Sequence, residues 1–238
     1  GIAAYVRNQY ERARLVGLEM SDPRDPAVPV RVRIEAEDAR VGRVDLTRGA
    51  FEVRRGAALF GWLPPLVRDA ALAPEGAARN RRDRLRQVAA SLVRRREADF
   101  VLPEPYVAEL AFELRPPVGF EVVERPEDRT VDLGPARYRA TFTLESGALR
   151  GRLRFDTGPA RLGAEALREL VAGLRALFTA PLVEVDLAHR GIRLLKAGRI
   201  RAGIKELARI SAARPDSAAH RARLALGLLE VGLGDAAR

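Results

Sequence analysis

The clearest pattern in the sequence is an alternation of apolar and polar residues between Tyr106 and Phe155. Successive side chains of a strand point to opposite faces, so a period of two places one face on a core and the other in water. The alternation continues on both sides of Ser146-Gly147, a two-residue loop that suits a tight hairpin. We therefore predict several strands of one antiparallel sheet, with a hairpin over Arg137–Asp156. The apolar members are Leu110, Phe112, Leu114, Tyr138, Ala140, Phe142, Leu144, Leu149, Leu153 and Phe155.

Weaker patterns of both periods precede this region. Apolar residues in Ile2–Gly17 recur every three to four positions, which predicts a helix. Val30–Glu35 alternates like a strand, and we expect Val41–Leu46 and Ala50–Val53 to be its neighbours and to extend the sheet. Trp62 is the only tryptophan and lies in a Pro-broken apolar segment. We expect it to be a packing anchor, because large aromatic side chains mostly fill cores.

A helical period follows the long alternation. The apolar residues between Leu167 and Phe178 fall on one helix face, which we expect to cover the sheet. The helix should end at Thr179-Ala180-Pro181, since the residue before proline avoids the helical region. Residues 1–185 are thus predicted to form an α+β domain, an antiparallel, β-sandwich-like sheet with a covering helix.

From Asp186 onward the chain is rich in Ala and Leu, and it repeats itself. Leu194-Leu195 recurs as Leu228-Leu229, and Gly198 recurs as Gly232, each 34 residues later. This period, with small residues where helices meet and glycine where they end, resembles a tetratricopeptide repeat. Residues 186–238 are therefore predicted to hold one complete and one truncated α-helical repeat. Because such repeats bury their faces against neighbours, we expect the chain to be a fragment of a longer protein.

The resemblance to this repeat implies a groove that binds extended or helical peptides. One candidate face carries Ile192 and Lys196, repeated 34 positions later as Leu226 and Glu230. These four residues are the candidate peptide-binding set, and the expected partner is a protein or a peptide. The alternative is that they pack on the sheet domain or on a further repeat.

Composition narrows the chemistry. The chain of 238 residues has 47% hydrophobic residues, enough for a sizeable core, and no cysteine. A disulfide, a thiolate metal site and a cysteine nucleophile are thereby excluded. No apolar run is long enough for a membrane-spanning helix, and no signal peptide follows Gly1.

The net charge of +10 invites a nucleic-acid interpretation. Aromatic residues are only 5% of the chain, and none is interleaved with the basic clusters as a base-stacking platform requires. We therefore expect a solvated Arg-rich surface and no nucleic-acid partner. The most basic part, Arg79–Arg86 with Arg94–Arg96, is either a phosphate-binding patch or, as we favour, a solvated helix face paired loosely with nearby acids.

No catalytic, cofactor-binding or metal-binding set emerges. His189 and His220 are the only histidines, lie apart from any cluster of acids, and are expected to be surface helix residues. Ser91 and Ser146 have no nearby histidine, and Gly232-Leu233-Gly234 has neither the third glycine nor the preceding strand of a phosphate loop. The chain itself is therefore predicted to be no enzyme and to need no cofactor.

Two motifs resemble a known family. Arg95–Pro103 has the form Arg-Arg-x-x-x-apolar-apolar-x-Pro, and Pro117–Val122 is a Pro-x-Gly-Phe-x-Val turn ahead of the alternating strands. This order resembles the β-rich module that lies C-terminal to the transglutaminase-like domain in large bacterial proteins that begin with a domain of unknown function. The resemblance covers about Gly1–Val185. It implies that the catalytic Cys, His and Asp belong to an upstream domain and that the protein is periplasmic or exported.

The prediction for function is a non-catalytic accessory and scaffold region of a transglutaminase-like, cysteine-protease-like bacterial protein, with protein or peptide binding through the helical repeat. Two alternatives stay open. In the first, the chain is the tail of an active transglutaminase-like hydrolase or acyltransferase whose catalytic domain lies upstream. In the second, it is an Arg-rich nucleic-acid binder. The sequence leaves the partner's identity and the oligomeric state open.

Overall fold

The computed structural model describes residues 14–22, 24, 32–37, 42–53 and 59–232. Within them the chain is mixed α/β, with antiparallel strand pairs and six helices, which confirms the α+β class. Two compact units are distinguished, one of residues 53–185 and the other of residues 1–52 together with 186–238. One division point thus falls between Val185 and Asp186. The other division point separates residues 1–52 from the unit that contains the long sheet. The predicted domain of residues 1–185 instead places residues 1–52 together with that sheet.

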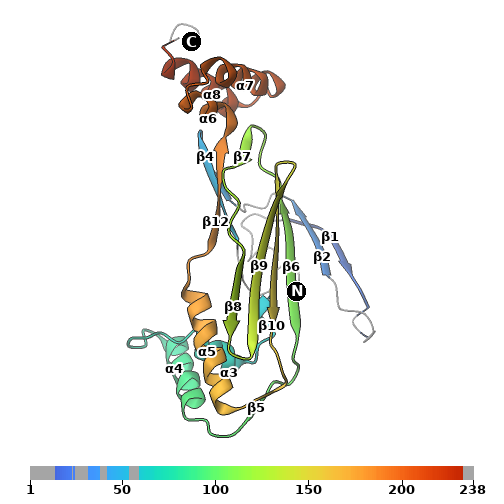
Figure 1. Cartoon of the computed structure of the whole chain (residues 1–238), viewed down its shortest axis with the longest axis vertical. Helices are drawn as coiled ribbons and strands as arrows, with labels where there is room; N and C mark the ends of the chain where they lie inside the picture. Colours follow the sequence, from blue (N-terminus) through green and yellow to red (C-terminus); the bar gives the residue numbers. More distant parts are fainter. Residues whose placement is uncertain (1–13, 23, 25–31, 38–41, 54–58, 233–238) are drawn as a thin grey trace. The chain divides into compact units, whose positions relative to one another are not determined.

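The unit of residues 53–185 is built on one four-stranded antiparallel sheet (Figure 1). Its order is β6-β10-β9-β8, so the hairpin of β9 and β10 lies in the middle. Ser146 and Gly147 close that hairpin with φ angles of 51° and 79°, the left-handed values that a tight two-residue turn needs. The predicted hairpin is confirmed. The strands are β6 (Val107–Leu114), β8 (Arg129–Leu133), β9 (Ala136–Glu145) and β10 (Ala148–Asp156).

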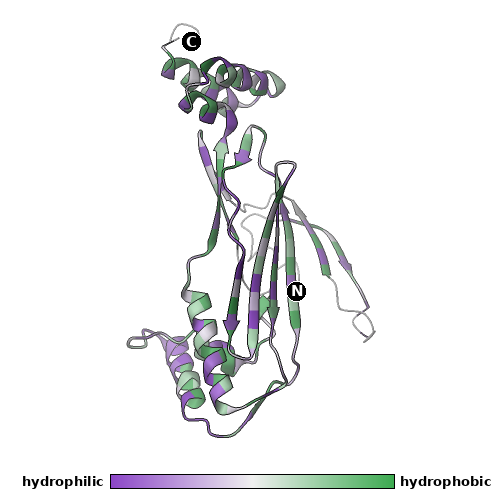
Figure 2. Ribbon diagram, in the orientation of Figure 1, coloured by the Kyte–Doolittle hydropathy of each residue, from purple (hydrophilic) through white to green (hydrophobic). Residues whose placement is uncertain are grey.

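The two faces of this sheet differ as the alternation predicts. One face is buried and holds the aromatic core residues Tyr138, Phe142 and Phe155. The other is exposed and holds Glu and Arg side chains, which Figure 2 shows as bands of opposite hydropathy along the strands. The pleat alone therefore explains why charged and apolar residues alternate here.

A helical layer covers the buried face. Helix α5 (Ala164–Thr179) buries Leu167, Leu170, Leu174 and Leu177, as predicted. It lies close to β8, because a Cβ added to Gly173 would stand 2.9 Å from the Leu133 Cα. Helices α3 (Pro65–Ala71) and α4 (Arg81–Arg94) pack beside α5. The described unit is thus a sheet with helices on one face, and the sandwich-like arrangement stays a prediction.

Trp62 corrects the sequence interpretation. Its side chain is 77% exposed, so the prediction of a packing anchor is wrong. A turn in which the Leu63 N–H donates to the Phe60 carbonyl, at 3.2 Å, directs residues 60 and 63 inward and residue 62 outward. Phe60 is the anchor instead, with its ring centroid 4.9 Å from that of Phe155 and 5.1 Å from that of Phe178.

Three short strands complete this unit. Strand β5 (Phe100–Val101) pairs with β11 (Arg161–Leu162), and β7 (Phe120–Val122) follows the Pro-x-Gly turn. In that turn the Phe120 N–H donates to the Pro117 carbonyl at 2.9 Å, and Gly119 has a φ of 86°. The motif is therefore a tight turn that requires glycine at its third position.

The other unit begins with strands. Strand β1 (Arg14–Met20) pairs antiparallel with β2 (Val32–Glu37), and β3 (Gly42–Val44), β4 (Arg48–Val53) and β12 (Val183–His189) are successive neighbours in another sheet. These strands therefore lie in other sheets and do not extend the long one as predicted. The predicted helix is wrong over residues 14–17, where pairing with β2 satisfies the backbone. Residues 2–13 of that prediction lie outside the described residues.

Three helices follow β12. They are α6 (Arg190–Lys196), α7 (Ile200–Ala213) and α8 (Ala218–Glu230). Gly198 follows α6 and Gly232 follows α8, with φ angles of 74° and 77°. The two glycines that the 34-residue offset pairs therefore share the left-handed conformation that commonly ends helices.

Candidate binding surfaces

The three C-terminal helices approach one another at glycines. A Cβ added to Gly191 would lie 2.6 Å from the Leu207 Cγ, and one added to Gly203 would lie 2.6 Å from the Leu195 Cδ2. Real Cβ atoms do not come so close, so α6 and α7 can pack at this distance only through glycine. Gly227 plays the same part in α8, where an added Cβ would lie 2.5 Å from the Leu207 Cδ1. These contacts give α6–α8 a well-defined backbone.

The four predicted peptide-binding residues do not share one environment. Ile192 is only 3% exposed and forms the core of these helices with Leu195 and Leu207. Lys196 at the end of α6 and Glu230 at the end of α8 are exposed, and Leu226 is 37% exposed. The structure therefore makes Ile192 a packing residue and leaves the other three accessible.

Sequence reasoning missed Leu229, which extends the accessible apolar surface of α8. Its side chain is 56% exposed, and it follows Leu226 by three positions, which places both on one side of the helix. The three-residue spacing from Leu226 could have indicated Leu229 from the sequence. The 34-residue offset instead relates Leu229 to Leu195, which is buried, and so gives no sign that Leu229 is accessible. We call Leu226 and Leu229 the α8 apolar pair.

Arg223 fixes α8 to the turn between β3 and β4. Its side chain is 6% exposed, its Nε donates to the Leu46 carbonyl at 2.7 Å, and its Nη2 donates to the Asp45 carbonyl at 2.9 Å. Burial lowers the pKa of the guanidinium, which nonetheless stays charged at neutral pH. A buried cation with two charge-assisted hydrogen bonds holds this helix in place. We call this contact the Arg223 clamp.

The turn that receives Arg223 is itself preorganised. The Asp45 carboxylate accepts hydrogen bonds from the Thr47 and Arg48 backbone N–H groups, both at 2.6 Å. These two bonds, first that from Arg48 and then that from Thr47, lower the pKa of the Asp45 carboxyl. An aspartate that binds its own backbone in this way fixes the turn, so the carbonyls of residues 45 and 46 are held ready for the clamp.

His189 lies beside the clamp and is not a surface residue as predicted. It is 1% exposed, ends strand β12, and donates its backbone N–H to the Thr47 carbonyl at 2.9 Å. Burial lowers the pKa of its imidazole to about 4, with the charges of Arg223 and His220 acting in the same direction and Glu206 opposing. His189 is therefore neutral at pH 7, which suits a packing role beside a buried cation.

His220 lies in the first turn of α8 and is half-buried. Its Nδ1 is 3.2 Å from the Nη1 of Arg223, and its backbone N–H donates to the Ser217 hydroxyl at 3.4 Å. Burial, followed by the Arg223 charge, lowers the pKa of the imidazole. Both histidines thus belong to the packing around the clamp. Among the residues that the structure describes, no group of three or more His, Asp and Glu side chains could hold a metal ion.

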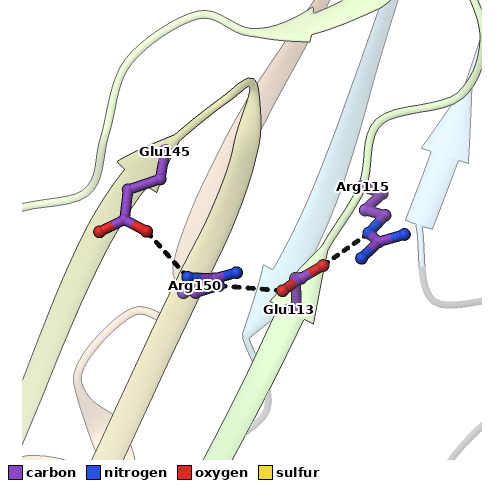
Figure 3. A network of polar contacts seen from close by, with 4 residues as sticks. All are labelled: Glu113, Arg115, Glu145 and Arg150. Carbon is purple, nitrogen blue, oxygen red and sulfur yellow. Dashed lines mark hydrogen bonds and ion pairs between the residues drawn. The ribbon is translucent and has the colours of Figure 1, made fainter.

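The exposed face of the long sheet is a ladder of ion pairs (Figure 3). Arg150 on β10 bridges Glu113 on β6, at 2.9 Å, and Glu145 on β9, at 2.8 Å, and Arg115 contacts Glu113 from the other side. The hydrogen bonds from Arg150 and then Arg115 lower the pKa of the Glu113 carboxyl. A shallow hollow of ≈ 510 Å³ lies over this ladder. Because its charges are paired within the sheet, the ladder is explained by cross-strand packing without a ligand.

The arginines at α4 behave differently from those of the sheet. Arg81, Arg82, Arg84, Arg94 and Arg95 are exposed, and their guanidinium groups form no ion pair with any described residue. Among the described arginines of this cluster, the loose pairing expected with neighbouring acids occurs at Arg86, which lies 4.0 Å from Asp83. Arg96 instead donates to the backbone carbonyl of Asp99 at 2.9 Å. The α4 region thus carries cations without internal partners.

No described helix is long and apolar enough to cross a membrane. Comparison of the chain with protein-family models, with curated proteins and with solved structures finds no match. A functional assignment for this chain therefore depends on its own residues and their geometry.

Proposed function

We propose that this chain is a non-catalytic binding and scaffold region whose helices α6–α8 hold a protein or peptide partner. The expected setting is the accessory region of a transglutaminase-like bacterial protein. The observation that carries the proposal is the α8 apolar pair, two leucines that remain 37% and 56% exposed on a helix that Arg223 and Gly227 hold in place. A fixed helix with exposed apolar side chains suits partner binding, because little order must be gained on association.

Two features support a preorganised binding helix. Gly227 brings α8 into close contact with Leu207 of α7, and the Arg223 clamp ties the same helix to the β3–β4 turn. The exposed Lys196 and Glu230 supply charges of both signs, so the expected ligand carries apolar anchors together with charged residues.

The composition supports a non-catalytic role within a transglutaminase-like protein. The thiol nucleophile of such an enzyme cannot come from a chain that has no cysteine. Of the two histidines, one is buried with a pKa of about 4 and the other contacts Arg223. A general base works best with a pKa near the operating pH, so His189 is poorly suited to that task.

The test is a selection of peptides from a displayed random library on the immobilised chain, followed by calorimetric titration of the enriched peptides. We expect the double substitution Leu226→Gln and Leu229→Gln to weaken binding at least about tenfold, as loss of two apolar anchors implies. The charge reversals Lys196→Glu and Glu230→Lys should change which peptides are enriched. Val118→Gln is the matched control, because Val118 is 47% exposed and lies in the other unit.

The proposal fails if no peptide is enriched, or if the enriched peptides bind the double variant as well as they bind the unmodified chain. Circular dichroism of each variant establishes that the helices are intact. Both leucines are partly solvent-exposed already, so their replacement should leave the fold unchanged.

A further inference from the structure

Helix α4 exposes a row of aliphatic side chains. Leu85, Val88 and Leu92 are 59%, 56% and 58% exposed, although the adjoining face fixes the helix to its unit through Ala89, Ala90 and Val93, which are buried. The exposed residues follow one another at spacings of three and four, which places them on one side of the helix. We call them the α4 seam.

The seam is bordered by cations. At 3.6 residues per turn, Arg81 lies one turn before Leu85, Arg84 one turn before Val88, and Arg95 one turn after Leu92. The only acidic residue of α4 is Asp83, which accepts a hydrogen bond from the Arg79 backbone N–H at 3.2 Å and lies toward the buried side. The seam is therefore an apolar row inside a positive field that no described acid neutralises.

The width of the seam identifies the kind of surface it fits. At 100° per residue the three side chains span about 60° of the helix circumference. A helix that lies in a membrane interface carries a broad apolar face, commonly 100° or more. Here Arg84 and Arg95 border the exposed row on one side, and buried Ala89 adjoins it on the other. Alternate spacings of three and four in a narrow row are the seam geometry of helix–helix packing. The occupant that matches is another helix.

The charge of the surrounding arginines indicates which kind of helix can bind the α4 seam. A second copy of α4 would bring arginine against arginine, since antiparallel pairing sets Arg81 near Arg95 and parallel pairing sets each residue near itself. Like charges so placed oppose association. We propose that the α4 seam docks an amphipathic helix of a partner protein whose apolar row is flanked by Asp and Glu. This site lies in residues 53–185 and is separate from the α8 apolar pair.

A single row of three aliphatic residues is small beside a standard interface of about 800 Å² per partner. The complex should therefore be weak, and sensitive to salt because the arginines are exposed. Both properties are measurable with a model ligand. A suitable probe is a fluorescein-labelled peptide of about three heptads, with leucine at the a and d positions and glutamate at the e and g positions.

The experiment titrates this probe with the whole chain and follows fluorescence anisotropy at low and at physiological salt. A peptide of identical composition, with its leucines distributed around the helix, is the matched ligand control. The double variant Val88→Gln, Leu92→Gln removes the seam and keeps the charge, and Val118→Gln is the matched protein control. The double variant Arg81→Gln, Arg95→Gln removes the flanking cations.

We expect saturable binding of the seam peptide, at least about tenfold weaker binding of the scrambled peptide, and a similar loss in the Val88→Gln, Leu92→Gln variant. The arginine variant should bind more weakly and depend less on salt. Circular dichroism should show unchanged helix content in every variant, since the replaced side chains are exposed.

Three results overturn the proposal. They are absence of saturable binding, equal affinity for the seam and scrambled peptides, and unchanged affinity in the Val88→Gln, Leu92→Gln variant. A parallel titration with vesicles containing phosphatidylserine covers the membrane alternative. Tighter binding to these vesicles than to the peptide, lost in the same variant, would assign the seam to an anionic membrane surface and also overturn it.

Discussion

Acidification from pH 7 to pH 5 should destabilise the unit that contains the C-terminal helices, because His189 must then accept a proton while buried. The imidazole is 1% exposed, and its pKa is lowered to about 4 from a value of 6.5. Burial is the main cause, the nearby Arg223 and His220 charges add to it, and Glu206 opposes it. A histidine whose pKa is lower in the folded state contributes stability above pH 6.5, and this stability is lost as the pH falls toward 4.

The size of the effect follows from the two pKa values. A shift from 6.5 to about 4 corresponds to roughly 3 kcal/mol when the pH falls below both values. Between pH 7 and pH 5, linkage gives a loss of about 2 kcal/mol in the free energy of unfolding. Carboxylates with lowered pKa values, such as Asp45 and Glu206, destabilise the fold only below their ordinary range near pH 4. The interval from pH 7 to pH 5 therefore isolates the two histidines from the carboxylates.

The assay is urea unfolding of the whole chain at pH 7, 6 and 5, followed by the helical circular dichroism signal. His189→Gln should be less dependent on pH by about 2 kcal/mol over this interval, whatever its stability at pH 7. The comparison of slopes removes the contribution of His220, which is present in both proteins. If the two proteins lose equal stability between pH 7 and pH 5, the reasoning from burial of His189 is refuted.

Three further predictions concern packing and charge. Arg223→Met should lower the free energy of unfolding by about 1.5 to 3 kcal/mol in urea titrations, because two carbonyls of the β3–β4 turn lose their charged donor; a change below about 0.5 kcal/mol would contradict the clamp. Gly173→Ala should destabilise by about 1 to 3 kcal/mol, since its Cβ would meet Leu133 at 2.9 Å, whereas Gly76→Ala, with open space, should not. Arg150→Gln should leave the urea midpoint unchanged, because exposed ion pairs contribute little, and a clear fall would show that the ladder is structural.

The long elements could be predicted because one simple rule governs each of them. Strand β10 alternates over its full length and β9 up to Phe142, the two strands meet at a Ser-Gly turn, and α5 keeps one apolar face over 16 residues. In both cases the periodic pattern is long enough to distinguish a strand from a helix, which short apolar runs do not allow. The same alternation places the arginines and glutamates of the ladder on the exposed face, so their presence there needs no functional explanation.

The errors arose where a single side chain depends on its tertiary neighbours. The pattern around Trp62 marks an apolar segment, but only the turn at residues 60–63 decides that Phe60 enters the core. The sequence predicts His189 to lie on a surface helix, yet it is the last residue of strand β12, directly before helix α6. Arg223 binds the carbonyl of Leu46, which precedes it by 177 residues, and no local sequence pattern predicts a contact between residues so far apart.

The candidate binding residues show how far the 34-residue period extends. The period correctly relates Gly198 to Gly232, which end helices in the same conformation. It fails for Ile192, because strand β12 occupies the positions before Arg190 and leaves α6 only 7 residues long, whereas α8 has 13. A short first helix is packed by α7 and α8 along most of its length, so its apolar residues become core. The residue of the longer α8 at the 34-residue offset, Leu226, stays accessible, so the apolar part of the proposed binding surface lies on α8.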